Sequence, residues 1–308
     1  MQIVLLGANG QLGHALAPRL AALGQVHALT RAHVDLSDAL HGARQLQAWM
    51  QTQGPAFRPD VLVNAAAYTA VDRAEREPDV AMQVNATSVG VLAHLARDMD
   101  ALLVHYSSDY VFDGRGKKPW REDDAPAPLS VYGQSKLLGE RAVAQAGGRH
   151  LILRTSWVVG THGGNFLKTM LRLAAERPTL RVVADQVGAP TSADWLAEVT
   201  ATLLAQLDAA GLDDPRWGLY HVAPEGSTSW HAYAQHVVAG AIARGGVLTC
   251  PPSAIEPIAT REYPTPAPRP LNSRLSTEKL RHTFAIVPPP WQQGVDAVLN
   301  ELLGPLTP

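Results

Sequence analysis

The stretch Gly7-Ala8-Asn9-Gly10-Gln11-Leu12-Gly13 directly follows the apolar run Ile3-Val4-Leu5-Leu6. Its three glycines have the spacing G-x-x-G-x-x-G, which is typical of the first turn of a dinucleotide-binding unit. There the first glycine permits a tight turn, the second lets a pyrophosphate approach the backbone, and the third lets a helix pack on the strand. The start of that helix offers free N–H groups and a positive dipole end to phosphates. We therefore predict that Gly7, Gly10 and Gly13 bind a dinucleotide; the alternative is an ordinary glycine-rich turn.

Outward from this turn, short apolar runs alternate with longer helical patterns. The strand-like runs are 3–6, 26–29, 61–63, 102–104 and 151–153. The first helical pattern follows the glycine turn and ends near Leu23, and the later ones are 39–50, 80–99 and 132–145. Uniformly apolar strands separated by helices indicate a parallel sheet that is covered on both faces. The fold class predicted is therefore α/β, with a doubly wound parallel sheet of the Rossmann type.

The alternation loosens after Gly160. A helix is predicted at 194–207 and a short strand at 219–222, and proline is dense between Cys250 and Pro270. Proline-rich sequence excludes a regular helix or a central strand there. We expect an ordered loop that wraps a site, because helical segments follow it; the alternative is a flexible linker. The later residues are predicted to form a smaller carboxy-terminal substrate-binding lobe.

Composition limits the class of protein. The chain has 308 residues, of which 46% are hydrophobic and 18% charged, as in a globular protein. The formal net charge of −2 gives no global basic field for nucleic acid or an anionic membrane. One cysteine, Cys250, excludes an intramolecular disulfide and fits a reducing compartment. Because no basic leader or membrane-length apolar run is seen, we expect a cytoplasmic protein.

The residues after the second predicted strand indicate which nicotinamide cofactor is bound. An acidic residue there would grip the adenosine ribose hydroxyls and favour NAD. This sequence has Thr30-Arg31 instead. Because a guanidinium can pair a 2′-phosphate through two hydrogen bonds, we predict a preference for NADPH, with NADH also accepted. The alternative is that Arg31 is a solvated surface charge. Asp35 is expected either to bind the adenine amino group or to cap the next helix.

Tyr132-Gly133-Gln134-Ser135-Lys136 forms a Y-x-x-x-K element. On a helix, residues four apart lie on one face, about 6 Å apart along the axis. A free tyrosine has a pKa of about 10, and an adjacent ammonium lowers that pKa by stabilising the phenolate. We therefore expect Tyr132 to donate a proton to a carbonyl oxygen that receives hydride, and Lys136 to hydrogen-bond the nicotinamide ribose.

A third component lies in Tyr106-Ser107-Ser108-Asp109-Tyr110, after the fourth predicted strand. Ligands of such sheets bind at the carboxyl ends of the strands. A serine hydroxyl at this place can hold the substrate carbonyl and orient its reduction. Ser107 and Ser108 compete for this role, and family resemblance favours Ser108. The alternative for the pair is capping of a helix or strand.

Several longer segments resemble the extended short-chain dehydrogenase/reductases and, among them, the dTDP-4-dehydrorhamnose reductase family. The segments that carry the resemblance cover essentially the whole chain: 7–13, 64–72, 108–114, 132–136, 154–158, 165–166, 185–191 and 269–275. That breadth is far more specific than either short motif. The expected domains are an NADP-binding Rossmann domain (1–160 plus about 192–224) and a sugar-nucleotide-binding lobe (about 161–191 plus 225–308).

The resemblance implies NADPH-dependent reduction of the C4 keto group of dTDP-4-dehydro-L-rhamnose to dTDP-L-rhamnose. This is the last step of dTDP-rhamnose biosynthesis, which serves bacterial surface polysaccharides such as the lipopolysaccharide O-antigen. Tyr132 matches the family's proton donor and Lys136 its partner, and Ser108 keeps a hydroxyl where threonine is usual. The positions that match cofactor contacts are Gly10, Gln11, Leu12, Asp35, Leu36, Ala67, Tyr68, Thr69 and Tyr106.

Four further residues are candidates for substrate contacts. Asp109 and Trp157 match substrate-contacting positions of the family, and the flat indole of Trp157 would cover the sugar ring. The alternative for Trp157 is plain core packing. Arg269, in the proline-dense segment, is our candidate for the substrate pyrophosphate because a cationic fork suits that dianion. Asn165 is expected to contact the nucleotide.

Some members of the family bind Mg²⁺ between two subunits through carboxylates. One expected glutamate position is Ala15 here, while Asp194 and Glu301 match the other two positions. Since losing one hard oxygen ligand weakens a magnesium site, we predict neither Mg²⁺ nor a metal-bridged dimer. The expected protein is a monomer or homodimer whose partner is a small sugar nucleotide.

Two alternative functions stay open. The first is another sugar-nucleotide reductase, epimerase or dehydratase on the same scaffold. A dehydratase would need an acidic pair beside the serine, and Ser108 is followed by one carboxylate, Asp109, and then by Tyr110. The second is a non-catalytic relative of the kind that forms the regulatory subunit of methionine adenosyltransferase. The presence of Tyr132, Lys136 and Ser108 favours catalysis.

Overall fold

A six-stranded parallel sheet forms the centre of the protein in the computed structural model, which describes residues 1–305. The strands lie in the order β2 (Gln25–Leu29), β1 (Gln2–Leu6), β3 (Val61–Asn64), β4 (Leu102–Ser108), β5 (His150–Thr155) and β8 (Gly218–His221). The order reverses at β1, because β2 pairs with one side of it and β3 with the other. The predicted doubly wound parallel sheet of the Rossmann type is therefore confirmed.

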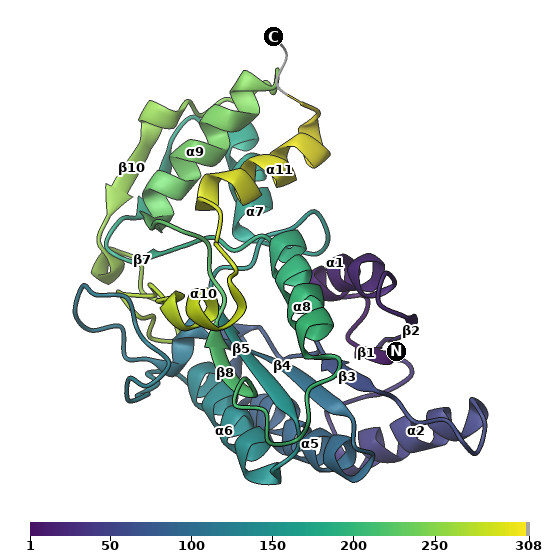
Figure 1. Ribbon diagram of the computed structural model, residues 1–308. Helices are drawn as coiled ribbons and strands as arrows, with labels where there is room; N and C mark the ends of the chain where they lie inside the picture. The colour runs from purple at the N-terminus through teal and green to yellow at the C-terminus, as the bar shows by residue number, and fades with distance from the viewer. Residues whose placement is uncertain (306–308) are drawn as a thin grey trace.

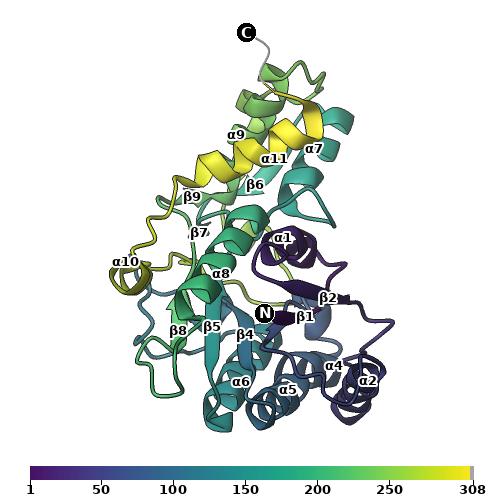
Figure 2. The ribbon, with the colours of Figure 1, turned by 45° about the vertical axis from the view of Figure 1, so that its right-hand side comes forward.

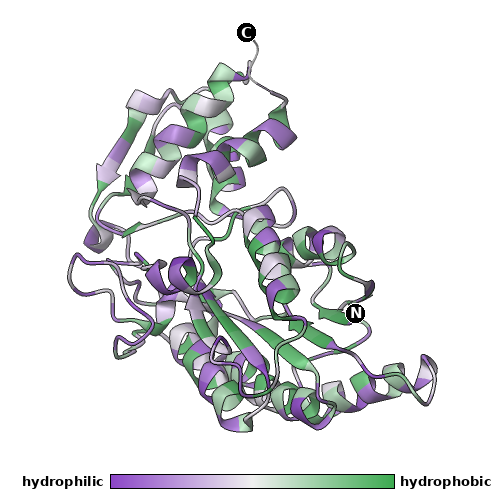
Figure 3. Cartoon of the chain, in the orientation of Figure 1, coloured by the Kyte–Doolittle hydropathy of each residue, from purple (hydrophilic) through white to green (hydrophobic). Residues whose placement is uncertain are grey.

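Helices cover both faces of this sheet (Figure 1). One face carries α1 (Gln11–Leu20) and α8 (Ala193–Leu207), and the other carries α2 (Ala39–Thr52), α5 (Ser88–Asp98) and α6 (Val131–Ala146). The strands are apolar at successive positions because each residue faces one of these two helical layers: Ile3, Val4 and Leu5 are all fully buried. Figure 3 shows the same pattern as hydrophobic strands beneath helices whose outer faces are polar.

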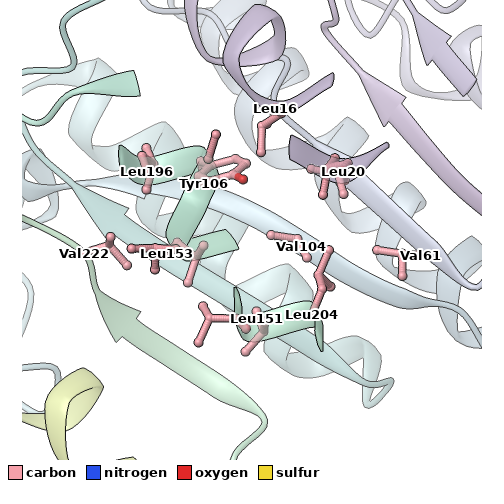
Figure 4. Close-up of a cluster of buried hydrophobic side chains, with 14 of the residues drawn as sticks. Leu16, Leu20, Val61, Val104, Tyr106, Leu151, Leu153, Leu196, Leu204 and Val222 are labelled. Atoms are coloured by element: carbon pink, nitrogen blue, oxygen red, sulfur yellow. The ribbon is translucent and has the colours of Figure 1, made fainter. Parts of the chain in front are cut away.

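The core beneath α1 and α8 contains large aliphatic side chains from both helices and from four strands. Figure 4 shows Leu16 and Leu20 of α1 above Val61 and Val104 of the sheet. Leu16 and Leu20 are fully buried. Replacing either leucine by alanine would remove buried methyl groups and leave a cavity, at a cost of about 2–5 kcal/mol. This layer fixes α1, and with it the glycine turn, against the sheet.

Two helix predictions need correction. The first helix ends at Leu20 rather than near Leu23, because the chain must turn at Gly24, where an added Cβ would collide with the Met1 carbonyl. The single helix predicted over 80–99 is three pieces: α4 (Pro78–Met82), a π-helical turn (Gln83–Thr87) and α5. A π-helical turn inserts one extra residue per turn, and such turns are frequent at functional sites.

The remaining residues build a smaller lobe above the carboxyl ends of the strands (Figures 1 and 2). Its core is formed by α7 (Phe166–Glu176), α9 (Trp230–Ala243), α11 (Trp291–Leu303), β6 (Leu180–Val183) and β10 (Ile255–Ile258). The lobe also holds β7 (Val187–Gly188) and β9 (Thr228–Ser229). In contrast, α3 (Val71–Ala74) follows β3, and α10 (Glu278–Phe284) packs Leu280 and Phe284 into the core beneath α1 and α8. The exact domain boundaries stay a proposal, supported by the separate apolar core of this lobe.

The proline-dense segment, predicted as a loop, contains a short strand, β10, between two 3₁₀ turns. Pro257 lies in β10, which pairs with β6 alone, so the missing N–H of proline disturbs no central strand. Asp185 accepts hydrogen bonds from the backbone N–H and the hydroxyl of Thr260. Farther along, Arg269 pairs with Asp72. Within residues 1–305, none of the helices has the length and apolar character that crossing a bilayer requires.

Candidate active site

The glycine turn lies at the point where the strand order reverses. Gly7 has φ +75°, and a Cβ added there would lie 2.7 Å from the backbone nitrogen of Ala66. A Cβ on Gly13 would collide with the Gly7 carbonyl, so the helix packs closely on the turn as predicted. Gly10 is the N-cap residue of α1 and has no side chain to cap it. The first N–H groups of α1 therefore suit a pyrophosphate.

Arg31 and Asp35 follow β2 and pair with each other. Nε of Arg31 lies 3.2 Å from Oδ2 of Asp35, and the Arg31 side chain is 77% exposed. Asp35 also accepts a hydrogen bond from the backbone N–H of Ser37, which lowers the pKa of its carboxyl. The N-cap residue of α2 is Asp38, so the capping alternative for Asp35 is wrong. Leu36 is buried beneath this turn, and the Thr30 hydroxyl contacts His33.

Ala67, Tyr68 and Thr69 follow β3, beside the glycine turn. The backbone of Tyr68 is held by Asn85: its N–H donates to Asn85 Oδ1 and its carbonyl accepts from Nδ2, both at 2.9 Å. Asn85 belongs to the π-helical turn and is buried. The sequence did not single it out, because buried asparagines in helices carry no general signal.

Tyr132 and Lys136 lie in the first turns of α6. The helix begins after Ser130, whose hydroxyl accepts a hydrogen bond from the N–H of Gly133. Serine is a favoured N-cap residue, so the sequence also indicates this start. Ser135, between the two candidates, donates to the carbonyl of Tyr132 and accepts from Nδ2 of Asn85. These bonds fix the part of the helix that carries both side chains.

The expected lowering of the Tyr132 pKa is not what this arrangement produces. Burial raises the pKa of Tyr132 to about 12, the negative charge of Asp109 adds to that rise, and a hydrogen bond with Ser108 opposes it. Nζ of Lys136 lies 2.6 Å from the Tyr106 carbonyl oxygen, to which it donates, instead of beside the phenol. Burial lowers the pKa of Lys136 to about 8, opposed by Glu140. Tyr132 is thus protonated at neutral pH, as a proton donor must be.

Ser108 ends β4 next to this helix, and Asp109 begins the short 3₁₀ turn that follows. Oγ of Ser108 donates to Oδ1 of Asp109 at 2.9 Å, and burial raises the pKa of Asp109 to about 6, opposed by Ser273 and Ser108. Oδ2 of Asp109 makes no hydrogen bond of normal geometry within residues 1–305, although Ser273 lies close to the carboxyl. Ser108 also caps the turn that follows, through the N–H of Tyr110. The hydroxyl of Ser108 is thus beside the candidate proton donor.

The side chain of Tyr106, a predicted cofactor contact, turns away from this edge. Its hydroxyl lies 2.8 Å from Oγ1 of Thr200 on α8, and its ring belongs to the core shown in Figure 4. Only its backbone carbonyl faces Lys136. Any cofactor contact of Tyr106 is therefore a backbone contact.

The predicted substrate residues lie in different settings. Trp157 follows β5 with φ +49° and stacks on Trp230, with ring centroids 3.6 Å apart. Asn165 is the N-cap residue of α7, and its Nδ2 donates to Oε1 of Gln11 in the glycine turn. Arg269 forms two hydrogen bonds with the carboxylate of Asp72, 2.9 and 2.8 Å long. The guanidinium of Arg269 is therefore already paired with a carboxylate. A contact between Arg269 and the substrate pyrophosphate stays a proposal.

Below the site lies a buried ion pair that the sequence reasoning missed. Arg154 of β5 donates to both carboxylate oxygens of Glu140 on α6, at 2.8 and 2.7 Å, and both side chains are at most 6% exposed. The Arg154 guanidinium also lies 5.0 Å from the ring centre of Phe112. Glu140 is four residues after Lys136, which places the two on one face of α6. A glutamate one turn beyond the Y-x-x-x-K element was the available signal.

Two hollows in the surface lie away from this site. One of about 420 Å³ is bordered by Met50, Phe57 and Met99, at the amino ends of the strands. Another of about 310 Å³ is bordered by Arg274 and by residues after β8. Neither is lined by a predicted site residue. The candidate active site is located instead by the polar side chains at the carboxyl ends of the strands.

The family model for the RmlD substrate binding domain matches residues 1–303. This chain belongs to that family. A family relative from Escherichia coli (strain K12), named dTDP-4-dehydrorhamnose reductase, is 46% identical over 303 residues, which are 98% of each chain.

Solved structures agree with this membership. The dTDP-4-dehydrorhamnose reductase from Bacillus anthracis str. Ames, in complex with NADP, is 32% identical and covers 97% of this chain and 99% of its own, with a TM-score of 0.83. A dTDP-glucose 4,6-dehydratase from Streptomyces venezuelae, with NAD and TYD bound, is 19% identical and covers 100% of both chains, with a TM-score of 0.76. The second likeness shows the fold alone.

Proposed function

We propose that this protein uses NADPH to reduce the C4 keto group of dTDP-4-dehydro-L-rhamnose, giving dTDP-L-rhamnose. The observation that carries the proposal is the 46% identity over 98% of both chains with a relative named for this activity. NADPH is supported by the NADP complex of the B. anthracis relative. Arg31, exposed after β2, is the residue that would pair the 2′-phosphate.

The residues at the carboxyl ends of the strands supply what such a reduction needs. The bound nicotinamide would supply a hydride to the C4 carbonyl carbon. Tyr132, protonated because its pKa is about 12, donates its phenolic proton to the carbonyl oxygen and so completes the alcohol. Ser108 would hold that oxygen by turning its hydroxyl proton to it from Oδ1 of Asp109, its acceptor in this structure, and would so orient the carbonyl. Lys136, whose ammonium reaches the Tyr106 carbonyl, holds the ribose side of the cofactor.

Other residues would hold the two ligands. The N–H groups at the start of α1 bind the cofactor pyrophosphate, and Ala67 to Thr69 line the path between adenosine and nicotinamide. Asp109, buried and with one carboxylate oxygen that has no hydrogen-bond partner among residues 1–305, would accept a hydrogen bond from a sugar hydroxyl. Trp157 offers its ring to the sugar. We further propose a cytoplasmic monomer or homodimer, in keeping with the net charge of −2 and the single cysteine.

Direct assay tests this proposal. The sugar nucleotide is made enzymatically and supplied with NADPH, oxidation is followed by absorbance, and the product is identified by NMR. We expect stoichiometric NADPH oxidation and dTDP-L-rhamnose. No turnover of this sugar would contradict the proposal, and release of an epimerised or dehydrated sugar without NADPH oxidation would favour the alternatives.

A further inference from the structure

Trp157 stands in a backbone conformation that a bulky residue rarely adopts. Its φ of +49° lies in the left-handed region, where a side chain meets the neighbouring carbonyl. Such strain persists only where surrounding structure enforces it, and it clusters at ligand sites. Trp157 is two residues beyond Thr155, which pairs with Ser108 in the sheet register. The strained residue therefore lies at the same edge as the catalytic hydroxyls.

One neighbour of Trp157 is another tryptophan, from the smaller lobe. The rings of Trp157 and Trp230 stack with centroids 3.6 Å apart and planes 16° apart. Trp230 is itself fixed: its indole N–H donates to Oε1 of Gln186 at 3.1 Å, and Phe166 packs against its ring at 4.6 Å. Trp157 thus rests on an aromatic surface that is already held in place.

The second neighbour is a backbone with no side chain. A Cβ built on Gly188 would lie 2.8 Å from Cε2 of Trp157 and 3.0 Å from Cβ of Ser273. Gly188 is buried, and its φ is not positive, so only the close approach requires glycine here. The backbone of Gly188 therefore fits between the indole and the Ser273 side chain that faces Asp109.

Both neighbours are carried by one small sheet. β7, which contains Gly188, pairs with β9, and Trp230 directly follows β9. Val187 also exchanges hydrogen bonds with the segment that carries Ser273: the N–H of Ser273 donates to the Val187 carbonyl at 2.7 Å. The indole, its support and the residue beside Asp109 are thus fixed relative to one another.

From these contacts we infer that Trp230 and Gly188 are positioning residues, which hold the Trp157 indole as a rigid wall of the sugar site and thereby set the affinity for the sugar nucleotide. The inference rests on the proposed function, because it takes a sugar to be the group that meets this wall. Neither residue touches Tyr132, Lys136 or the glycine turn in any hydrogen bond or ring contact of the described residues. Both act through Trp157.

The test is a kinetic comparison of Trp230→Ala, Trp230→Phe, Trp157→Ala and the Trp157→Ala/Trp230→Ala double variant. Loss of an aromatic pair is worth a factor of roughly 2–12 in affinity. We expect Trp230→Ala to raise KM for the sugar nucleotide by about that factor, with kcat and the KM for NADPH nearly unchanged. Trp230→Phe, which keeps a ring, should restore most of the loss. The double variant should be no worse than Trp157→Ala, since Trp230 acts through Trp157.

Gly188→Ala tests the other neighbour. Its Cβ would displace the indole or Ser273, so KM for the sugar nucleotide should rise while the KM for NADPH stays constant. Gly211→Ala is the matched control, because nothing lies within 4 Å of a Cβ at that position. Circular dichroism of each variant reports whether the fold is intact.

Three outcomes would overturn the inference: an unchanged sugar KM in both Trp230→Ala and Gly188→Ala, an equal rise in both KM values, or effects of Trp157→Ala and Trp230→Ala that multiply. Should a variant fail to fold, Trp230→Phe and Trp230→Leu are compared, because both keep apolar volume. A sugar KM that rises only in Trp230→Leu shows that the aromatic ring, and not only the volume, supports Trp157. Turnover by the wild-type protein is measured first. Its absence contradicts the proposed function, whereas its presence with unaffected variants contradicts this inference alone.

Discussion

The ammonium group of Lys136 donates a hydrogen bond to the backbone carbonyl of Tyr106, and the two atoms are 2.6 Å apart. This bond ties α6 to the end of β4, at the edge where the glycine turn and Ser108 also lie. Lys136 bonds this carbonyl, and its charge is not among the causes that shift the pKa of the Tyr132 phenol. In the proposed mechanism, the two residues of the Y-x-x-x-K element would therefore have separate tasks: Lys136 would hold the cofactor ribose, and Tyr132 would give a proton.

The pH dependence of turnover should separate these tasks. Burial lowers the pKa of Lys136 to about 8, so its positive charge is present below that pH and lost above it. Tyr132, with a pKa of about 12, keeps its proton throughout. We expect kcat/KM to fall with an apparent pKa near that of Lys136 as the pH rises. A profile that stays flat up to the titration range of a free tyrosine would contradict this assignment.

Breaking the Glu140–Arg154 pair should destabilise the fold strongly. Glu140→Gln leaves the Arg154 guanidinium buried without its counter-charge, which costs about 3–5 kcal/mol of unfolding free energy. Urea denaturation measures this change. The control is Arg172→Ala, which removes a pair whose side chains are 60% and 51% exposed and should cost less than about 1 kcal/mol. Similar losses in both variants would show that burial of the pair is unimportant.

Asp109 should lower stability at neutral pH in exchange for substrate binding. Burial raises its folded-state pKa to about 6, above the unfolded value, so the folded state holds the proton more tightly. Stability from this group is therefore lost as the pH rises from about 4 to about 6. We expect Asp109→Asn to be more stable than the wild type at pH 7, by about 1–3 kcal/mol, and to lose that advantage in acid. Equal pH dependence of unfolding in the two proteins would refute this.

Arg31 should decide between the two nicotinamide cofactors. Losing a charge-assisted contact with a phosphate costs about 1.5–3 kcal/mol, so Arg31→Ala should raise the KM for NADPH by roughly 10- to 100-fold. The KM for NADH should barely change. The control is Arg19→Ala, which removes an exposed arginine on α1 instead of the one after β2. If the wild type prefers NADH, the assignment of Arg31 is wrong.

Much of the fold follows from local sequence rules. The glycine spacing and the uniformly apolar strands predict a parallel sheet, and each predicted strand from 3–6 to 219–222 overlaps an observed one. All bounds agree within two residues except those of 102–104, which extends to Ser108. These signals are strong because a doubly covered strand needs apolar residues on both faces. The π-helical turn at Gln83–Thr87 was missed because its cause is tertiary. Asn85 in it bonds Tyr68 and Ser135, and Gly139 of α6 packs against its carbonyl.

The site was predictable in its residue types but not in its contacts. The carboxyl ends of parallel strands lie at one edge of the sheet, and Ser108 is at the end of β4 on this edge. The first turns of α6, which carry Tyr132 and Lys136, lie beside it. That Lys136 contacts a carbonyl, that Arg269 pairs with Asp72, and that Trp157 stacks on Trp230 all depend on residues 30 to 197 positions apart. No periodicity or spacing rule reaches across such separations.

Tyr132→Phe, assayed beside the wild type, tests the central claim most directly. With NADPH and dTDP-4-dehydro-L-rhamnose, the wild type should oxidise the cofactor and form dTDP-L-rhamnose. The variant should lose roughly 10²- to 10⁴-fold in kcat, because the carbonyl oxygen no longer receives a proton, while its affinity for NADPH stays unchanged. A Tyr132→Phe protein that turns over at the wild-type rate would contradict the account.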